Sequence, residues 1–247
     1  MGKIKQIICT ALLSLGCGEI GWTIEECSPE MEAYIEYSGH AISQYEERMI
    51  REIEEKVDPA LQEIPPRLVF DYLFSNEVQI KCAIPDEQRT LGAFIYNEDG
   101  NDLIMISSPH FQSIYEDNIE PNEEFLNEDG TFNFKLAEDL IRNDTNLYEG
   151  KGFNRAFEAN QSITPALAEL VEVIVHEATH GTWEKYRLSP KHRCENHTCE
   201  EKSERETDPF YQYDSVAREV IKSEVRLETS NALNHMAFEN YVLHNHD

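Results

Sequence analysis

Two histidines and a glutamate in one short segment have the spacing of a metal-binding catalytic site. His176 and His180 are four residues apart, and Glu177 directly follows the first histidine. On a helix, side chains four residues apart project from the same face, so both imidazoles can reach one Zn²⁺ ion. A third protein ligand would leave one position for a water, whose pKa the zinc lowers towards neutrality. Glu177 would then take the proton of that water, so the segment predicts metal-assisted hydrolysis.

The residues around this motif predict a long and largely buried helix. Thr164 has the pattern of an N-cap and Pro165 that of a first-turn proline, and no helix breaker follows until Gly181. The apolar positions of this stretch are Leu167, Leu170, Val171, Ile174, Val175 and Ala178. Buried histidines and a buried glutamate need partners, which a metal ion provides. The competing interpretation is a surface helix that carries the motif by chance.

This helix resembles the signature helix of the zincin metallopeptidases, in which the sequence HExxH lies among uncharged residues. The resemblance extends from about Thr164 to Tyr241. It implies an α+β fold with a small mixed sheet, a motif helix and C-terminal helices, and it implies a zinc cofactor. It also implies that a protein or peptide substrate binds in extended form along an edge strand of the sheet.

The third zinc ligand is expected on a final helix from about Asp214 to Tyr241. One stripe of this helix is apolar apart from two glutamates, Glu224 and Glu228. A carboxylate on a buried face needs a cation or hydrogen-bond donors, and zinc is the candidate cation. Glu224 follows His180 by 44 positions, a separation similar to that in gluzincins of the anthrax lethal factor type. Glu224 is therefore expected to be the ligand, with Glu228 orienting a histidine or exchanging roles with Glu224.

A second resemblance, to aspzincins of the deuterolysin type, offers Asp208 as the ligand instead. These enzymes share the HExTH core and carry GTxDxxYG downstream, and Asp208-Pro209-Phe210-Tyr211 matches its DxxY portion. The glycines and the short spacing of that motif are absent, so Asp208 is the second choice. Tyr211 or Tyr213 is the candidate donor to the oxyanion of the tetrahedral intermediate.

The first half of the chain predicts one helix followed by a small sheet. The helix runs from Pro29 to about Val57, where apolar residues recur at helical spacing. Four short runs rich in β-branched and aromatic residues are expected to be strands, namely 68–74, 78–84, 91–96 and 103–107. Residues 103–107 are the candidate edge strand. Residues 109–152 are expected to be irregular apart from a short helix at 135–141.

The formal net charge of −27 argues against charge-driven binding to nucleic acid or to an anionic membrane. Residues 1–18 resemble a signal peptide or a lipoprotein leader, since Lys3 and Lys5 precede a short apolar stretch and Cys17 ends a lipobox-like sequence. Residues 19–247 would form one catalytic domain that lacks an integral membrane segment, with a possible lipid anchor at Cys17.

The number and spacing of the cysteines are consistent with an exported protein that contains disulfides. If Cys9 and Cys17 belong to the leader, the remaining four can form the pairs Cys194–Cys199 and Cys27–Cys82. A second zinc site formed by His192, Cys194, His197 and Cys199 is the alternative for the first pair. The chain is thus expected to be a secreted or cell-surface zinc endopeptidase. The rival function is a zinc-binding or surface interaction protein that keeps the fold without turnover.

Overall fold

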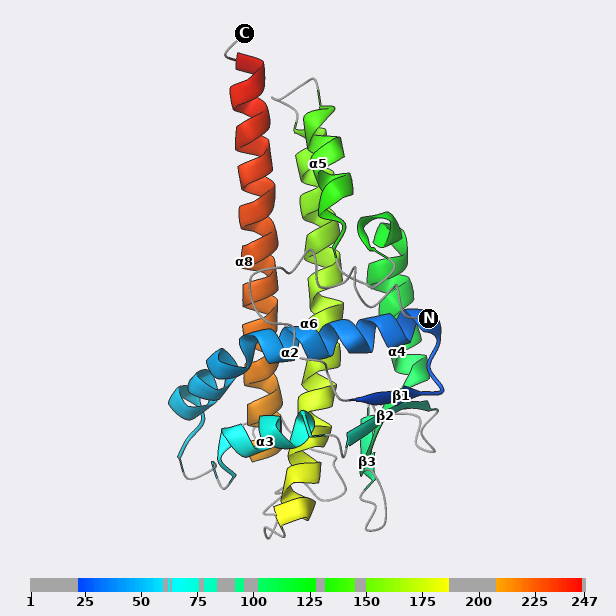
Figure 1. Ribbon diagram of the computed structural model, residues 1–247, viewed down its shortest axis with the longest axis vertical. Coiled ribbons are helices and arrows are strands. Elements are labelled where there is room, and N and C mark those ends of the chain that lie inside the picture. The colour runs from blue at the N-terminus through cyan, green and yellow to red at the C-terminus, as the bar shows by residue number, and fades with distance from the viewer. Residues whose placement is uncertain are drawn as a thin grey trace.

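The fold is a mixed α+β arrangement in which two long helices lie side by side and a small sheet flanks one of them (Figure 1). A computed structural model describes residues 22–59, 62, 64–75, 78–83, 92–95, 102–127, 132–144, 150–186 and 208–245. Helix α6 (Lys151–Tyr186) carries the HExxH motif, and helix α8 (Pro209–Asn245) is the C-terminal helix.

Helices α6 and α8 run antiparallel. Glu172 pairs with Arg218, and His176, one turn later on α6, pairs with Asp214, one turn earlier on α8. Helix α6 begins well before the expected cap, so Pro165 lies inside the helix. The upstream turns persist because Ala156, Ala159 and Ile163 are buried against α5 (Phe134–Arg142) and α8. Tertiary packing here outweighs the local preference of proline for a helix start.

Helix α2 (Pro29–Lys56) crosses α6 and α8 and belongs to the same core (Figure 1). Its start follows the sequence pattern, since the Ser28 hydroxyl accepts a hydrogen bond from the Met31 N–H and Pro29 occupies the first turn. Ile35, Ile42 and Met49 are fully buried. Helix α2 therefore belongs to the same folded body as the motif helix.

The sheet has four strands in the order β1-β2-β4-β3. Strands β1 (Thr23–Glu25), β2 (Val78–Ala83) and β4 (Asp102–Ser107) are parallel, whereas β3 (Gly92–Ile95) runs antiparallel to β4. The prediction that residues 103–107 form an edge strand is wrong, because β4 lies between β2 and β3. The edge that faces the motif helix is β3, where a Cβ on Gly92 would lie 2.7 Å from Val173 Cγ1 and 3.0 Å from Glu177 Oε1.

Residues 68–74, expected to be a strand, belong instead to helix α3 (Pro66–Leu73). Short apolar runs are ambiguous in periodicity, and here a proline in the first turn and the spacing of Val69, Phe70 and Leu73 favour the helix. Residues 108–125 are also more regular than expected. They form α4 (Ser108–Ile114), the π-helix η1 (Tyr115–Ile119) and the 3₁₀-helix η2 (Glu120–Phe125).

The predicted Cys27–Cys82 disulfide is present and joins the start of the described chain to β2. The predicted pair Cys194–Cys199 and the alternative zinc site there lie outside the described residues, as does the leader. Among the described helices, none is long and apolar enough to cross a membrane.

Gly181, the residue after the motif, lies directly against the Tyr72 ring of α3, and a Cβ there would collide with it. Gly181→Ala should therefore lower the free energy of unfolding by about 1–3 kcal/mol, as overpacking of a core does. Urea denaturation measures this change. In an unobstructed helix the same substitution stabilises by roughly 0.5–1 kcal/mol. In a Tyr72→Ala background it should be neutral or stabilising, and a stabilised single variant would contradict the packing.

Candidate metal centre

The two motif histidines project from one face of α6 and meet at their outer ring nitrogens. His176 Nε2 and His180 Nε2 are 3.2 Å apart. Two nitrogens that each lie about 2.0–2.1 Å from one tetrahedral zinc ion are separated by roughly 3.3–3.4 Å. The separation of the two rings therefore fits a shared zinc ion with little movement of either side chain.

Asp214, in the second turn of α8, orients the first histidine. Its Oδ2 lies 2.8 Å from His176 Nδ1, and the residue is only 3% exposed. With a carboxylate at Nδ1, the Nδ1–H donates to Asp214, and Nε2 is the nitrogen left to bind a metal. Sequence reasoning missed this role. The sequence did contain a signal for it, because Asp214 lies one turn before Ala217 and therefore on the same apolar stripe of α8.

The charge around His176 favours its protonated form when no metal is bound. Burial alone would lower the pKa of His176, but the hydrogen bond to Asp214 and the negative charges of Asp214, Glu177 and Asp208 outweigh it and raise the pKa from 6.5 to about 9. For Asp214, burial raises the pKa, and the contact with His176 opposes that effect. At neutral pH a zinc ion must therefore displace a proton from His176.

A second polar pair lies one turn away between the same two helices. Arg218 donates from Nη1 to Glu172 Oε2 at 2.9 Å. Burial, followed by the nearby charge of Asp214, raises the pKa of Glu172 to about 7, although Arg218 acts in the opposite direction. The two pairs together set the register in which the start of α8 lies beside the motif.

The residues that begin α8 surround the histidine pair. Asp208 is fully buried, and its Oδ1 accepts a hydrogen bond from the Phe210 N–H, which caps the helix. The Phe210 ring stacks on His180 with a centroid separation of 4.2 Å. The Tyr211 ring lies 4.9 Å from the His176 ring. Asp208 and Tyr211, both named from the DxxY resemblance, are thus brought to the site.

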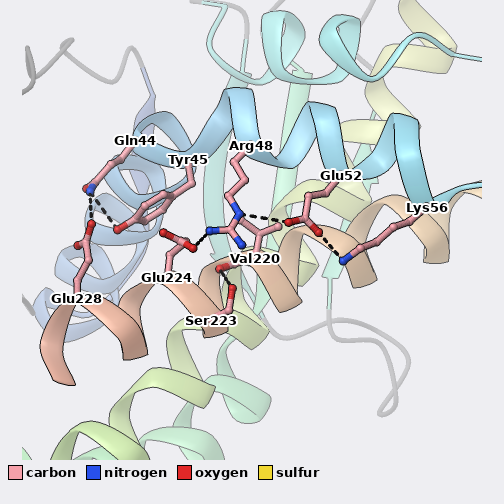
Figure 2. A network of polar contacts seen from close by, with 9 residues as sticks. All are labelled: Gln44, Tyr45, Arg48, Glu52, Lys56, Val220, Ser223, Glu224 and Glu228. Atoms are coloured by element: carbon pink, nitrogen blue, oxygen red, sulfur yellow. Dashed lines mark hydrogen bonds and ion pairs between the residues drawn. The ribbon is translucent and has the colours of Figure 1, made fainter. Parts of the chain in front are cut away.

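Glu224 and Glu228 face α2 instead of the histidines, contrary to the expected ligand positions (Figure 2). Glu224 forms an ion pair with Arg48, and Glu228 accepts a hydrogen bond from Gln44 Nε2 at 3.3 Å. Glu224 follows Asp214 by ten residues, which is about 15 Å along a helix at 1.5 Å per residue. The cation and the donor that these carboxylates require come from α2, and the structure does not bring either glutamate to the histidine pair.

Tyr213 is also placed away from the site. Its hydroxyl donates to the Ile64 carbonyl at 2.6 Å, and the residue is 1% exposed. Burial, followed by the charge of Glu54, raises the pKa of Tyr213. Since its hydroxyl is engaged in the core, Tyr211 is the remaining candidate donor to an oxyanion.

Glu177 is buried between the motif helix and the edge strand β3. It is 7% exposed, and its Oε1 would lie 3.0 Å from a Cβ on Gly92. The carboxylate therefore lies at the strand where an extended peptide would be added.

The described residues contain no ready group of three or more histidine, cysteine, aspartate or glutamate side chains arranged to hold a metal ion. The donor set is thus two histidines at zinc-compatible separation with a buried aspartate close by. Comparisons with protein-family models, curated proteins and solved structures found no match for the chain.

The raised pKa of His176 predicts how the stability of the metal-free protein depends on pH. A histidine whose pKa rises from 6.5 to about 9 on folding contributes stability that is fully present below pH 6.5 and is lost as pH rises through 9. With a chelator present, the free energy of unfolding from urea denaturation should therefore fall over this range. Asp214→Asn should flatten the slope, whereas His235→Gln, at an exposed histidine of α8, should leave it unchanged. A slope that survives Asp214→Asn would contradict the assignment.

Proposed function

We propose that this chain is a zinc-dependent endopeptidase of the zincin type, with His176 and His180 as zinc ligands. The observation that carries the proposal is the 3.2 Å separation of the two Nε2 atoms, with Asp214 bound to the opposite nitrogen of His176. A histidine ligand held by a carboxylate at its other ring nitrogen is the usual arrangement around protein-bound zinc.

We assign the third ligand to Asp208, the second choice of the sequence comparison. Three observations support it. Its charge is close enough to raise the pKa of His176, its side chain is fully buried, and the ring two residues later stacks on His180. A change of side-chain rotamer is needed, because the described residues hold no ready group of three ligands. With this ligand set the site is closer to the deuterolysin type than to the lethal factor type.

With zinc bound at this site, Glu177 and Tyr211 would have separate roles in the hydrolysis of a peptide bond. A zinc ion bound here supplies Lewis acidity to a water molecule and to the peptide carbonyl. Glu177 takes the proton of the attacking water and passes it to the leaving amine. Tyr211, beside His176, donates a hydrogen bond to the developing oxyanion. The substrate is a polypeptide bound in extended form along β3, whose outer edge has no strand partner among the described residues.

We also propose that the protein acts outside the cytosol, as a secreted or cell-surface enzyme. The Cys27–Cys82 disulfide supports this location, because structural disulfides persist in oxidising compartments and are rare in the cytosol.

Glu177→Gln should abolish hydrolysis of an unfolded substrate such as casein while zinc remains bound, because it removes a proton acceptor and no ligand. The expected loss in rate is on the order of 10²- to 10⁴-fold. The matched control is Glu184→Gln, an exposed glutamate seven residues later on α6, which should retain full activity. Hydrolysis unchanged by Glu177→Gln would refute the mechanism. A wild-type protein that binds one zinc ion and cleaves nothing would favour the zinc-binding rival.

Asp208→Ala should weaken zinc binding far more than Glu224→Ala, since the first removes a proposed ligand and the second an ion pair to Arg48. A zinc titration in competition with a chelator gives the order. Asp214→Asn should fall between them, with a loss of roughly 10- to 100-fold, typical of residues that orient a ligand. Thermal unfolding of each metal-free variant separates lost affinity from lost stability. If Glu224→Ala proves the most damaging, the assignment of Asp208 is wrong.

A further inference from the structure

The outer face of α8 carries an unusual concentration of exposed apolar side chains. Five large hydrophobic residues are exposed among the described residues, and three of them lie in the second half of this helix: Leu227 at 55%, Phe238 at 66% and Tyr241 at 55%. The opposite face of the same half packs on α5 and α6 through Leu233, which is fully buried. This half of α8 is therefore packed on one side and carries exposed apolar side chains on the other.

The exposed positions follow a heptad pattern. Leu227, Asn231, Asn234, Phe238 and Tyr241, called the outer stripe below, are separated by four, three, four and three residues, and all five are exposed. This spacing places them along one seam of the helix, as in the a and d positions of a coiled coil. A stripe of this kind fits a second helix laid along it.

The outer stripe is also free of formal charge, although the chain carries a net charge of −27. Two copies of so acidic a protein repel one another over most approaches. The second half of α8 projects together with α5 and α6 (Figure 1), so two copies can bring their uncharged outer stripes into contact with little repulsion.

We propose that the outer stripe joins two copies of this chain through an antiparallel pairing of their α8 helices about a two-fold axis. In this register Leu227 of each copy lies against Phe238 of the other and Asn231 lies against Asn234, while Tyr241 extends past Leu227 to the level of Glu224. Apolar meets apolar, and each amide meets an amide that can both donate and accept. From Leu227 to Phe238 the pattern is self-complementary, as a two-fold interface requires.

The antiparallel direction follows from where the rest of the molecule lies. Helix α2 packs on α8 at Glu224 and Glu228, directly before and beside the start of the outer stripe (Figure 2). A parallel pairing would bring both α2 helices and both acidic bodies to the same end of the seam. An antiparallel pairing places them at opposite ends, where repulsion is lower.

The interface leaves the metal centre accessible. Phe238 follows Asp214 by 24 residues, about 36 Å along the helix at 1.5 Å per residue. Dimerisation therefore does not rest on the proposed peptidase activity, and substitutions in the outer stripe should leave zinc binding unchanged.

Phe238→Glu tests the interface, because it places a charge in the seam of both copies. Sedimentation velocity of the wild-type protein should show a monomer–dimer equilibrium, which the substitution shifts by about 100-fold or more towards monomer. The matched control is Tyr186→Glu, which adds the same charge at an exposed aromatic residue at the end of α6 and should leave dimerisation unchanged. A wild-type protein that stays monomeric up to about 1 mM, or a dimer insensitive to Phe238→Glu, would overturn the proposal.

Cysteine pairing tests the direction. In the antiparallel register, a mixture of Asn231→Cys and Asn234→Cys proteins should form the mixed disulfide, identified by peptide mapping, because these positions lie opposite each other. Neither variant alone should link to itself, since its two copies are offset by three residues along the seam. Efficient linking of either variant to itself would instead indicate parallel helices and overturn the antiparallel arrangement.

Discussion

The buried hydrogen bond between His176 and Asp214 is the contact on which the site depends. It joins the two longest helices at a point where both partners are largely shielded from water. A buried carboxylate or imidazolium is stable only when it is paired, so each of these residues requires the other in the metal-free protein. The same bond selects Nε2 of His176 as the atom that faces His180. The contact that joins α8 to α6 therefore also orients His176, the proposed zinc ligand.

The register of α8 against α6 needs support beyond that single bond. The ion pair between Glu172 and Arg218 is a second contact between α6 and α8 near the site. Helix α2 holds the following turns of α8 through the contacts Arg48–Glu224 and Gln44–Glu228 (Figure 2). A one-residue slip of α8 would rotate its inner face by about 100° and separate Asp214 from His176. The glutamates that resembled zinc ligands thus contribute to the site indirectly, by fixing the helix that carries Asp208, Tyr211 and Asp214.

The sequence was most informative where a spacing has one physical meaning. Two histidines four residues apart must share a helix face, and apolar residues at helical spacing from Pro29 to about Val57 predict the helix that is found as α2. The sequence was least informative where a pattern shows only that a side chain requires a partner and not which residue supplies it. A glutamate on an apolar stripe requires a cation, but Glu224 finds an arginine from a helix more than 160 residues earlier, which no local pattern shows. The prediction of a strand at 68–74 was wrong for a related reason, since a short apolar segment can be buried equally well as a helix or as a strand.

Close backbone approach on two sides explains why the motif helix is held so firmly. Gly92 lets β3 approach Val173 and Glu177, and Gly181 lets the Tyr72 ring of α3 approach the turn after His180. Tyr72 is itself held by a hydrogen bond from its hydroxyl to Asp102 Oδ2 at 2.7 Å, at the start of β4. The sheet therefore contacts the motif helix directly before the motif, through β3, and indirectly after it, through Tyr72. Any shift of β3 along β4 would move the edge strand relative to Glu177, so the register of the sheet also determines the geometry of the proposed catalytic site.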